Sequence, residues 1–222
     1  GSFVSLVGES GCGKSTIAGI LAAKNRGYNG EITIGGVPLN EVREENLMQK
    51  VVLVRHNSYL FKGTVEENLK MAKPDATKEE MEAVLQKVNL LGFLQTQDGL
   101  QTQLSEKASN LSGGQCQRLV IARALLRTDS AVYIFDEAAS NIDVESEELI
   151  MNVIHELAKT KTVLLISHRL ANVVKSDKIY FLKDGEIKES GKHDELMSQN
   201  GAYRHLYESQ MALENYGKGG VA

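Results

Sequence analysis

Residues 8–15 read Gly8-Glu9-Ser10-Gly11-Cys12-Gly13-Lys14-Ser15 and fit the pattern G-x-x-x-x-G-K-S/T. The apolar run Phe3–Val7 before them predicts a short buried strand, and Ile17–Lys24 predicts the helix that follows. Such a loop wraps its N–H groups around phosphates at the N-terminus of the helix. Lys14 would add a full positive charge, and the Ser15 hydroxyl could bind Mg²⁺. A glycine turn with a solvated lysine is the alternative, but strand, loop, lysine, hydroxyl and helix together favour a phosphate site.

Strand and helix patterns alternate along the rest of the chain. Strands are expected at Glu31–Ile34, Val51–Val54, Ala131–Phe135, Thr162–Ile166, Lys178–Leu182 and Glu186–Ser190. Helices are expected at Thr64–Lys70, Lys78–Val88 and Val144–Ala158, and two short helices close the chain. This alternation predicts an α/β fold with a parallel sheet. Because the stretch near 64–127 is mostly helical, we expect a helical subdomain at 63–130 and a sheet-bearing core at 1–62 and 131–222.

The composition is that of an ordinary globular protein. The 222 residues are 42% hydrophobic, which supplies enough apolar material for a core and excludes disorder as the main description. With 25 basic and 29 acidic residues there is no global positive field for nucleic acid. The most apolar stretches are of strand length, far short of the roughly 20 residues of a membrane-spanning helix. Cys12 and Cys116 are too few for a disulfide framework.

Two carboxylates follow the apolar strand Ala131–Phe135. Asp136 and Glu137 come directly after it, and ligands of α/β sheets bind at the carboxyl ends of strands. Asp136 could hold Mg²⁺, and Glu137 could polarise an attacking water as a general base. Two solvated acids at a strand end are the alternative, and the phosphate loop in the same chain favours the functional interpretation.

A second glycine-rich loop, Leu111-Ser112-Gly113-Gly114-Gln115, precedes a helix expected over about Gln115–Arg127. Ser112 and Gln115 fit a capping box, so an ordinary helix start is one interpretation. The extra glycines exceed what capping needs. They suit a second phosphate that approaches bare backbone N–H groups at a helix N-terminus.

These motifs, in this order, resemble the nucleotide-binding domain of ATP-binding cassette (ABC) transporters over nearly the whole chain. Residues 8–15 resemble its Walker A motif, 111–115 its signature and 132–136 its Walker B motif. Residues 140–143, Ser140-Asn141-Ile142-Asp143, are similar to its D-loop, and His168 to its switch histidine. Resemblance to the exporters of the family rests on the segments 60–69 and 191–196 and on Glu106.

The resemblance implies a P-loop NTPase fold: a RecA-like ATP-binding core with a mostly parallel sheet, an inserted α-helical subdomain and a truncated antiparallel β subdomain. It implies an ATPase that uses ATP and Mg²⁺, with Glu137 and His168 as catalytic residues and with Ser15 and Asp136 as metal ligands. The nucleotide-binding residues that it implies are Gly8, Glu9, Ser10, Gly11, Cys12, Gly13, Lys14, Ser15, Thr16, His56, Ser112, Gly113, Gly114 and Gln115.

The resemblance also implies partners. Two such domains, identical or different, would form a head-to-tail dimer with two ATP molecules between the Walker A motif of one and the signature of the other. The closing and opening of this dimer would drive transmembrane domains, on the same or a partner chain, that move a substrate. The dimer would lie at the cytoplasmic face of the cell membrane. No nucleic acid is expected as a partner. Two alternatives stay open: a soluble ABC-type ATPase that acts on DNA or ribosomes, and an ATP-binding regulatory module with little turnover.

Three features depart from the family pattern. His56 stands where the family has the glutamine of its Q-loop, so we expect weaker or pH-sensitive coupling; a surface histidine without a role is the alternative. Ser105 and Ala108 replace glycines of the exporter X-loop, which would cost stability where that loop needs a positive φ. Only two residues precede the Phe3 strand, so we expect a fragment with reduced nucleotide affinity and an exposed sheet edge.

Overall fold

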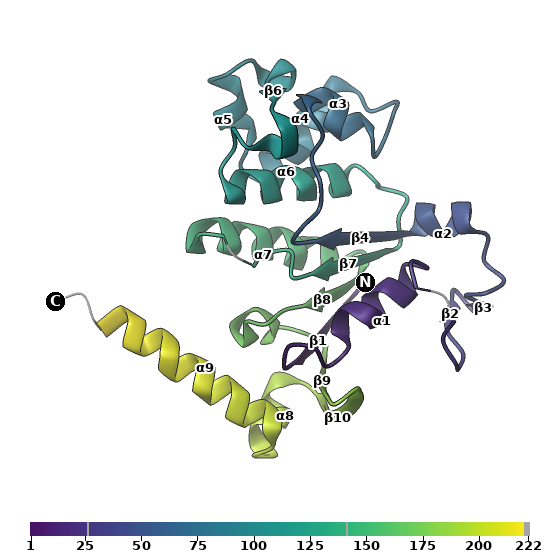
Figure 1. The fold of residues 1–222 in the computed structure, drawn as a ribbon, viewed down its shortest axis with the longest axis vertical. Helices are drawn as coiled ribbons and strands as arrows, with labels where there is room; N and C mark the ends of the chain where they lie inside the picture. The colour runs from purple at the N-terminus through teal and green to yellow at the C-terminus, as the bar shows by residue number, and fades with distance from the viewer. Residues whose placement is uncertain (26, 141, 220–222) are drawn as a thin grey trace.

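A six-stranded sheet forms the centre of the computed structural model, which describes residues 1–25, 27–140 and 142–219 (Figure 1). The strand order is β10-β9-β1-β8-β7-β4. The strands β1 (Ser2–Gly8), β8 (Thr162–Ile166), β7 (Val132–Asp136) and β4 (Val51–Arg55) pair in parallel, and β9 (Lys178–Lys183) lies parallel to β1 on its other side. Only β10 (Glu186–Gly191) is antiparallel to its neighbour in this sheet. The predicted α/β fold with a mostly parallel sheet is confirmed.

Two hydrophobic cores cover the two faces of the sheet. In β7, Tyr133 and Phe135 belong to the larger core, while Ile134 between them belongs to the smaller one, as the alternation of side chains along a strand requires. The larger core continues into α6 (Gly113–Leu125) and α7 (Val144–Ala158). The smaller core includes α1 (Lys14–Leu21) and α2 (Glu44–Lys50). Burial on both faces explains why the central strands are apolar almost throughout.

The helices between β4 and β7 gather at one end of the molecule (Figure 1). They are α3 (Val65–Lys70), α4 (Lys78–Lys87), α5 (Leu91–Gln95) and α6. The capping box expected for α4 forms: Glu80 N–H donates to Thr77 Oγ1 at 3.2 Å, and Thr77 N–H donates to Glu80 Oε2 at 3.0 Å. The region between α5 and α6 holds the short elements η1 (Gly99–Gln101), β6 (Gln103–Leu104, paired with β5, Gly63–Thr64) and η2 (Glu106–Ala108).

Two elements in the first 40 residues differ in extent from the expectation. Of the strand predicted at Glu31–Ile34, only β2 (Thr33–Ile34) forms, and it pairs with β3 (Val37–Pro38) through Gly35 and Gly36, whose φ angles are 61° and 81°. This antiparallel hairpin is separate from the main sheet. The first helix begins at Lys14 rather than Ile17, because the left-handed backbone of Gly13 (φ 105°) ends the loop and the helix begins at the next residue.

The C-terminal part is built on the hairpin of β9 and β10. Its turn is Asp184-Gly185, as expected, with φ angles of 52° and 77°. The helix α8 (His193–Ser198) follows, but α9 (Ala202–Gly219) has 18 residues, so the prediction of two short helices is wrong for the second. A nucleated helix continues at little cost per residue. Within the described residues, no helix is both long and apolar enough to span a membrane.

Candidate active site

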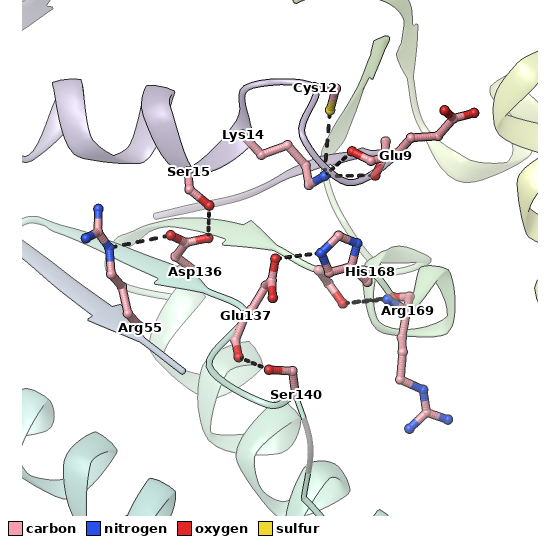
Figure 2. A network of polar contacts seen from close by, with 12 residues as sticks. Glu9, Cys12, Lys14, Ser15, Arg55, Asp136, Glu137, Ser140, His168 and Arg169 are labelled. Carbon is pink, nitrogen blue, oxygen red and sulfur yellow. Dashed lines mark hydrogen bonds and ion pairs between the residues drawn. The ribbon is translucent and has the colours of Figure 1, made fainter. Parts of the chain in front are cut away.

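The sheet brings three distant segments to one edge. β1, β8 and β7 are neighbours, and their register pairs Leu6 and Asp136 with the same residue, Ile166. Because the strands are parallel, the segments that leave their carboxyl ends start side by side. These segments are the loop 8–15, the acidic pair Asp136-Glu137 and the segment that contains His168 (Figure 2).

The loop between β1 and α1 encloses the Lys14 ammonium. Its Nζ donates to the carbonyl oxygens of Gly8 and Glu9, both at 2.8 Å, and lies 3.6 Å from Cys12 Sγ (Figure 2). Lys14 is only 4% exposed. Gly8 has a φ of 145°, and a Cβ there would lie 2.0 Å from the Leu182 carbonyl oxygen, so no larger residue fits. The loop therefore holds a buried cation. Around it, residues of the loop and of the first turn of α1 are exposed: Ser10, Gly11, Ser15 and Thr16.

Ser15 and Asp136 meet across 121 residues of sequence. The Ser15 hydroxyl donates to Asp136 Oδ1 at 3.0 Å, and Asp136 is 4% exposed. A hydroxyl and a carboxylate are oxygen donors of the kind that Mg²⁺ takes, with substrate phosphates and water completing its shell. The pair fits a Mg²⁺ site of that kind. No group of three or more His, Cys, Asp or Glu suited to a metal occurs among the described residues.

Glu137 and His168 also meet. His168 Nε2 lies 2.6 Å from Glu137 Oε1, and the two side chains are 42% and 23% exposed (Figure 2). The Glu137 backbone has a positive φ of 55° and is fixed on both sides. Its N–H donates to the Ile166 carbonyl oxygen at 3.0 Å, and its own carbonyl oxygen accepts from Ser140 N–H at 3.0 Å and Oγ at 2.8 Å. The carboxylate is thus held at the rim of the site, within reach of solvent.

His56 lies beside the same edge, because β4 pairs with β7. Its N–H donates to the Asp136 carbonyl oxygen at 3.2 Å, and its side chain is exposed. Arg55 is in register with Asp136, and its Nε lies 3.6 Å from Asp136 Oδ2. Sequence reasoning missed Arg55. A basic residue at the end of the strand next to the Asp136 strand was the available signal.

The second glycine loop begins α6 as a capping box. Gln115 N–H donates to Ser112 Oγ at 3.2 Å, and Ser112 N–H donates to Gln115 Oε1 at 2.9 Å. A Cβ on Gly114 would lie 2.4 Å from Ser146 Oγ, whereas a Cβ on Gly113 would meet no atom within 4 Å. In the described part of the chain, no hydrogen bond or ion pair joins this loop to the loop 8–15. The hydrogen bonds described for each glycine loop thus stay on its own side of the site.

Two other segments singled out in the sequence are the D-loop-like residues 140–143 and the stretch around Glu106. In the D-loop-like segment Asn141 lies outside the described residues, while Asp143 caps α7 by accepting from Ser146 N–H at 2.8 Å. This bond keeps the pKa of the Asp143 carboxyl below its usual value. Of the two glycine replacements near Glu106, Ala108 does adopt a positive φ (51°), whereas Ser105 has a φ of −70°. Of these two replacements, only Ala108 therefore has the expected strained backbone, and Lys107 beside it also has a positive φ (57°).

A family model described as "ABC transporter" matches residues 1–140. An "Uncharacterized ABC transporter ATP-binding protein" of Haemophilus influenzae is 50% identical over 208 residues, which is 94% of this chain and 37% of that protein. An "ATP-dependent lipid A-core flippase" of Vibrio vulnificus is 42% identical over 212 residues, 95% of this chain and 36% of the flippase. A solved bacterial Atm1-family ABC exporter with ATP bound matches with a TM-score of 0.88 and 32% identity, over 94% of this chain and 36% of that one. The chain thus spans little more than a third of the length of these proteins.

Proposed function

The chain belongs to the ABC transporter family as an exporter-type nucleotide-binding domain, and from this we propose that it binds ATP with Mg²⁺ and hydrolyses it to power transport by a larger exporter. The observation that carries the proposal is the meeting of Ser15 with Asp136 and of Glu137 with His168 at one sheet edge beside the lysine loop. Each contact joins residues that are far apart in sequence. Together they supply phosphate binding, oxygen donors for a cation and a base.

Phosphate binding falls to the loop 8–15. Lys14 Nζ is already buried and held by two carbonyl oxygens of the loop, so it can exchange these acceptors for phosphate oxygens while remaining desolvated. The backbone N–H groups of the loop and the first turn of α1 point partial positive charge at the same place. Mg²⁺ held by Ser15 and Asp136 would neutralise charge on the phosphates.

The hydrolytic step falls to Glu137 and His168. The Glu137 carboxylate accepts the proton of the attacking water, because it is the acid at the open rim of the site and its backbone is fixed on both sides. His168 orients this carboxylate through the 2.6 Å contact and can itself donate toward the terminal phosphate.

The remaining assignments concern the second glycine loop and the larger assembly. We propose that Ser112, Gly113, Gly114 and Gln115 serve the site of a second domain, identical or different, in a head-to-tail dimer with two ATP molecules between the chains. In this assembly, residues 1–62 and 131–222 would form the ATP-binding core and 63–130 the subdomain that carries the signature. His56, whose N–H bonds the carbonyl oxygen of Asp136, would face the metal and the membrane domain. The membrane domain places the assembly at the cytoplasmic face of a membrane.

The test is the pair of variants Glu137→Gln and Glu148→Gln. Glu148 is exposed on α7, so the second variant makes the same chemical change away from the site. We expect Glu137→Gln to lower phosphate release by at least about a hundredfold, as loss of a general base does, and to retain ATP binding, while Glu148→Gln matches the wild type. We also expect Glu137→Gln with Mg-ATP to shift in solution mass from monomer to dimer. ATP binding with no phosphate release by the wild type would favour a regulatory module instead.

A further inference from the structure

The segment that carries His168 is held by side chains from two helices. On one side, the buried carboxylate of Glu147 on α7 pairs with Arg169 and accepts from Asn172 Nδ2 at 2.7 Å. On the other side, Gln210 of α9 makes two hydrogen bonds: its Nε2 donates to the His168 carbonyl oxygen at 2.6 Å, and its Oε1 accepts from Leu170 N–H at 2.9 Å. One amide therefore spans the backbone from His168 to Leu170.

The chemistry of these two bonds fixes the orientation of the Gln210 amide. A carbonyl oxygen can only accept and a backbone N–H can only donate, so the nitrogen must face His168 and the oxygen must face Leu170. Gln210 is partly buried, and its contacts reach 42 and 40 residues back along the chain. The residues are brought together by the packing of α9 against η3 (Leu170–Val173).

The start of α9 is itself anchored to the sheet. Glu189 of β10 accepts from the backbone N–H groups of Ala202 and Tyr203, at 2.5 and 3.2 Å, and the Tyr203 side chain is fully buried. Gln210 lies two turns further along this helix. The His168 side chain, in contrast, is 42% exposed, so packing around its ring does little to fix it. Its position depends on its contact with Glu137 and on the backbone that carries it.

We propose that Gln210 is a positioning residue for His168, and that α9 thereby acts on the hydrolytic step through the backbone of 168–170. This inference rests on the proposed function, because it assigns His168 a part in hydrolysis. The hydrogen bonds of the Gln210 amide go to backbone atoms of His168 and Leu170, so its effect on His168 passes through the backbone. It keeps the imidazole at the distance from which it can orient Glu137.

The experiment compares Gln210→Leu with Ser209→Ala in the 222-residue chain. Leucine keeps most of the volume and removes both hydrogen bonds, while Ser209 is an exposed neighbour whose hydroxyl donates to the His205 carbonyl oxygen within α9. We expect Gln210→Leu, which removes two hydrogen bonds, to lower kcat about tenfold, with KM for Mg-ATP within twofold of the wild type. Ser209→Ala should match the wild type.

A double-mutant cycle separates positioning from a general structural role. If Gln210 acts through His168, Gln210→Leu lowers kcat no further when His168 is already alanine. The same tenfold loss in the His168→Ala background would overturn the proposal, as would an unchanged kcat in the single variant. Amide exchange of Leu170 provides a readout that needs no turnover. Faster exchange in Gln210→Leu supports the clamp, and unchanged exchange refutes it, even if the wild type hydrolyses no ATP and the proposed function fails.

Discussion

Gly113 and Gly114 are adjacent glycines that do different things, and replacing each with alanine separates their roles. In Gly114→Ala the new Cβ would lie 2.4 Å from Ser146 Oγ and 2.8 Å from Asp143 Oδ2. Forcing extra volume into such a site costs about 1–3 kcal/mol, and disturbing the Asp143 cap of α7 costs about 1 kcal/mol more. Alanine recovers up to about 1 kcal/mol of helix propensity. The net loss is about 2 kcal/mol in the free energy of unfolding.

This loss is measured by thermal unfolding without nucleotide. For a chain of this size, about 2 kcal/mol lowers Tm by about 4–8 °C. Gly113→Ala should leave Tm unchanged or slightly raised, because its Cβ meets no atom within 4 Å, yet it should weaken ATP-dependent dimerisation if bare N–H groups there face a phosphate. Adding Ser146→Ala to Gly114→Ala should restore part of Tm. Equal Tm values for the two glycine variants would refute the reasoning.

Three further predictions concern charge and titration. Arg55→Ala should lower the Mg²⁺ concentration for half-maximal ATPase activity several-fold, because the guanidinium lies 3.6 Å from Asp136 Oδ2 and repels a second cation there. Arg55→Lys keeps the charge and should change this concentration less. An unchanged Mg²⁺ titration for Arg55→Ala would contradict the prediction. His56→Gln should raise the rate of ATP hydrolysis, because the glutamine amide offers both an acceptor oxygen and donor N–H groups beside Asp136, and an unchanged rate would leave His56 as a surface residue without a role. Burial raises the pKa of the Tyr133 phenol to about 12; since the fold favours the neutral phenol, the free energy of unfolding should fall as pH rises from 10 to 12, and urea titrations should show a smaller fall for Tyr133→Phe. An equal fall in both proteins would contradict this last prediction.

The parts of the site that could be predicted were those coded by local pattern. The loop 8–15 has its glycines, lysine and hydroxyl within eight residues, and the acidic pair follows an unmistakable apolar strand. Their juxtaposition followed from one further rule, that parallel strands end at the same edge. The same locality explains why the capping box of Ser112 and Gln115 was predicted correctly.

The features of the site that could not be predicted depend on tertiary contacts or on an unusual backbone conformation. The positive φ of Glu137 has no sequence signal, because glutamate rarely adopts it. Gln210 meets His168 only because α9 packs on η3, and a polar residue on a predicted helix gives no hint of such a partner. Arg55 acquires its neighbour from strand order. The strand predicted at Glu31–Ile34 shortened to two residues because the glycine turn after it forms a small separate hairpin.

The place of β1 in the sheet has a consequence for the chain during its synthesis. β1 lies between β8 and β9, so both of its neighbours are encoded about 160 residues later. At about 5–20 residues per second, the ribosome supplies those neighbours on the order of ten to thirty seconds after β1 has been translated. Throughout that interval Phe3, Leu6 and Val7 lack the strands that bury them. We expect the nascent chain to bind chaperones through this segment, and to release them only once β9 has emerged.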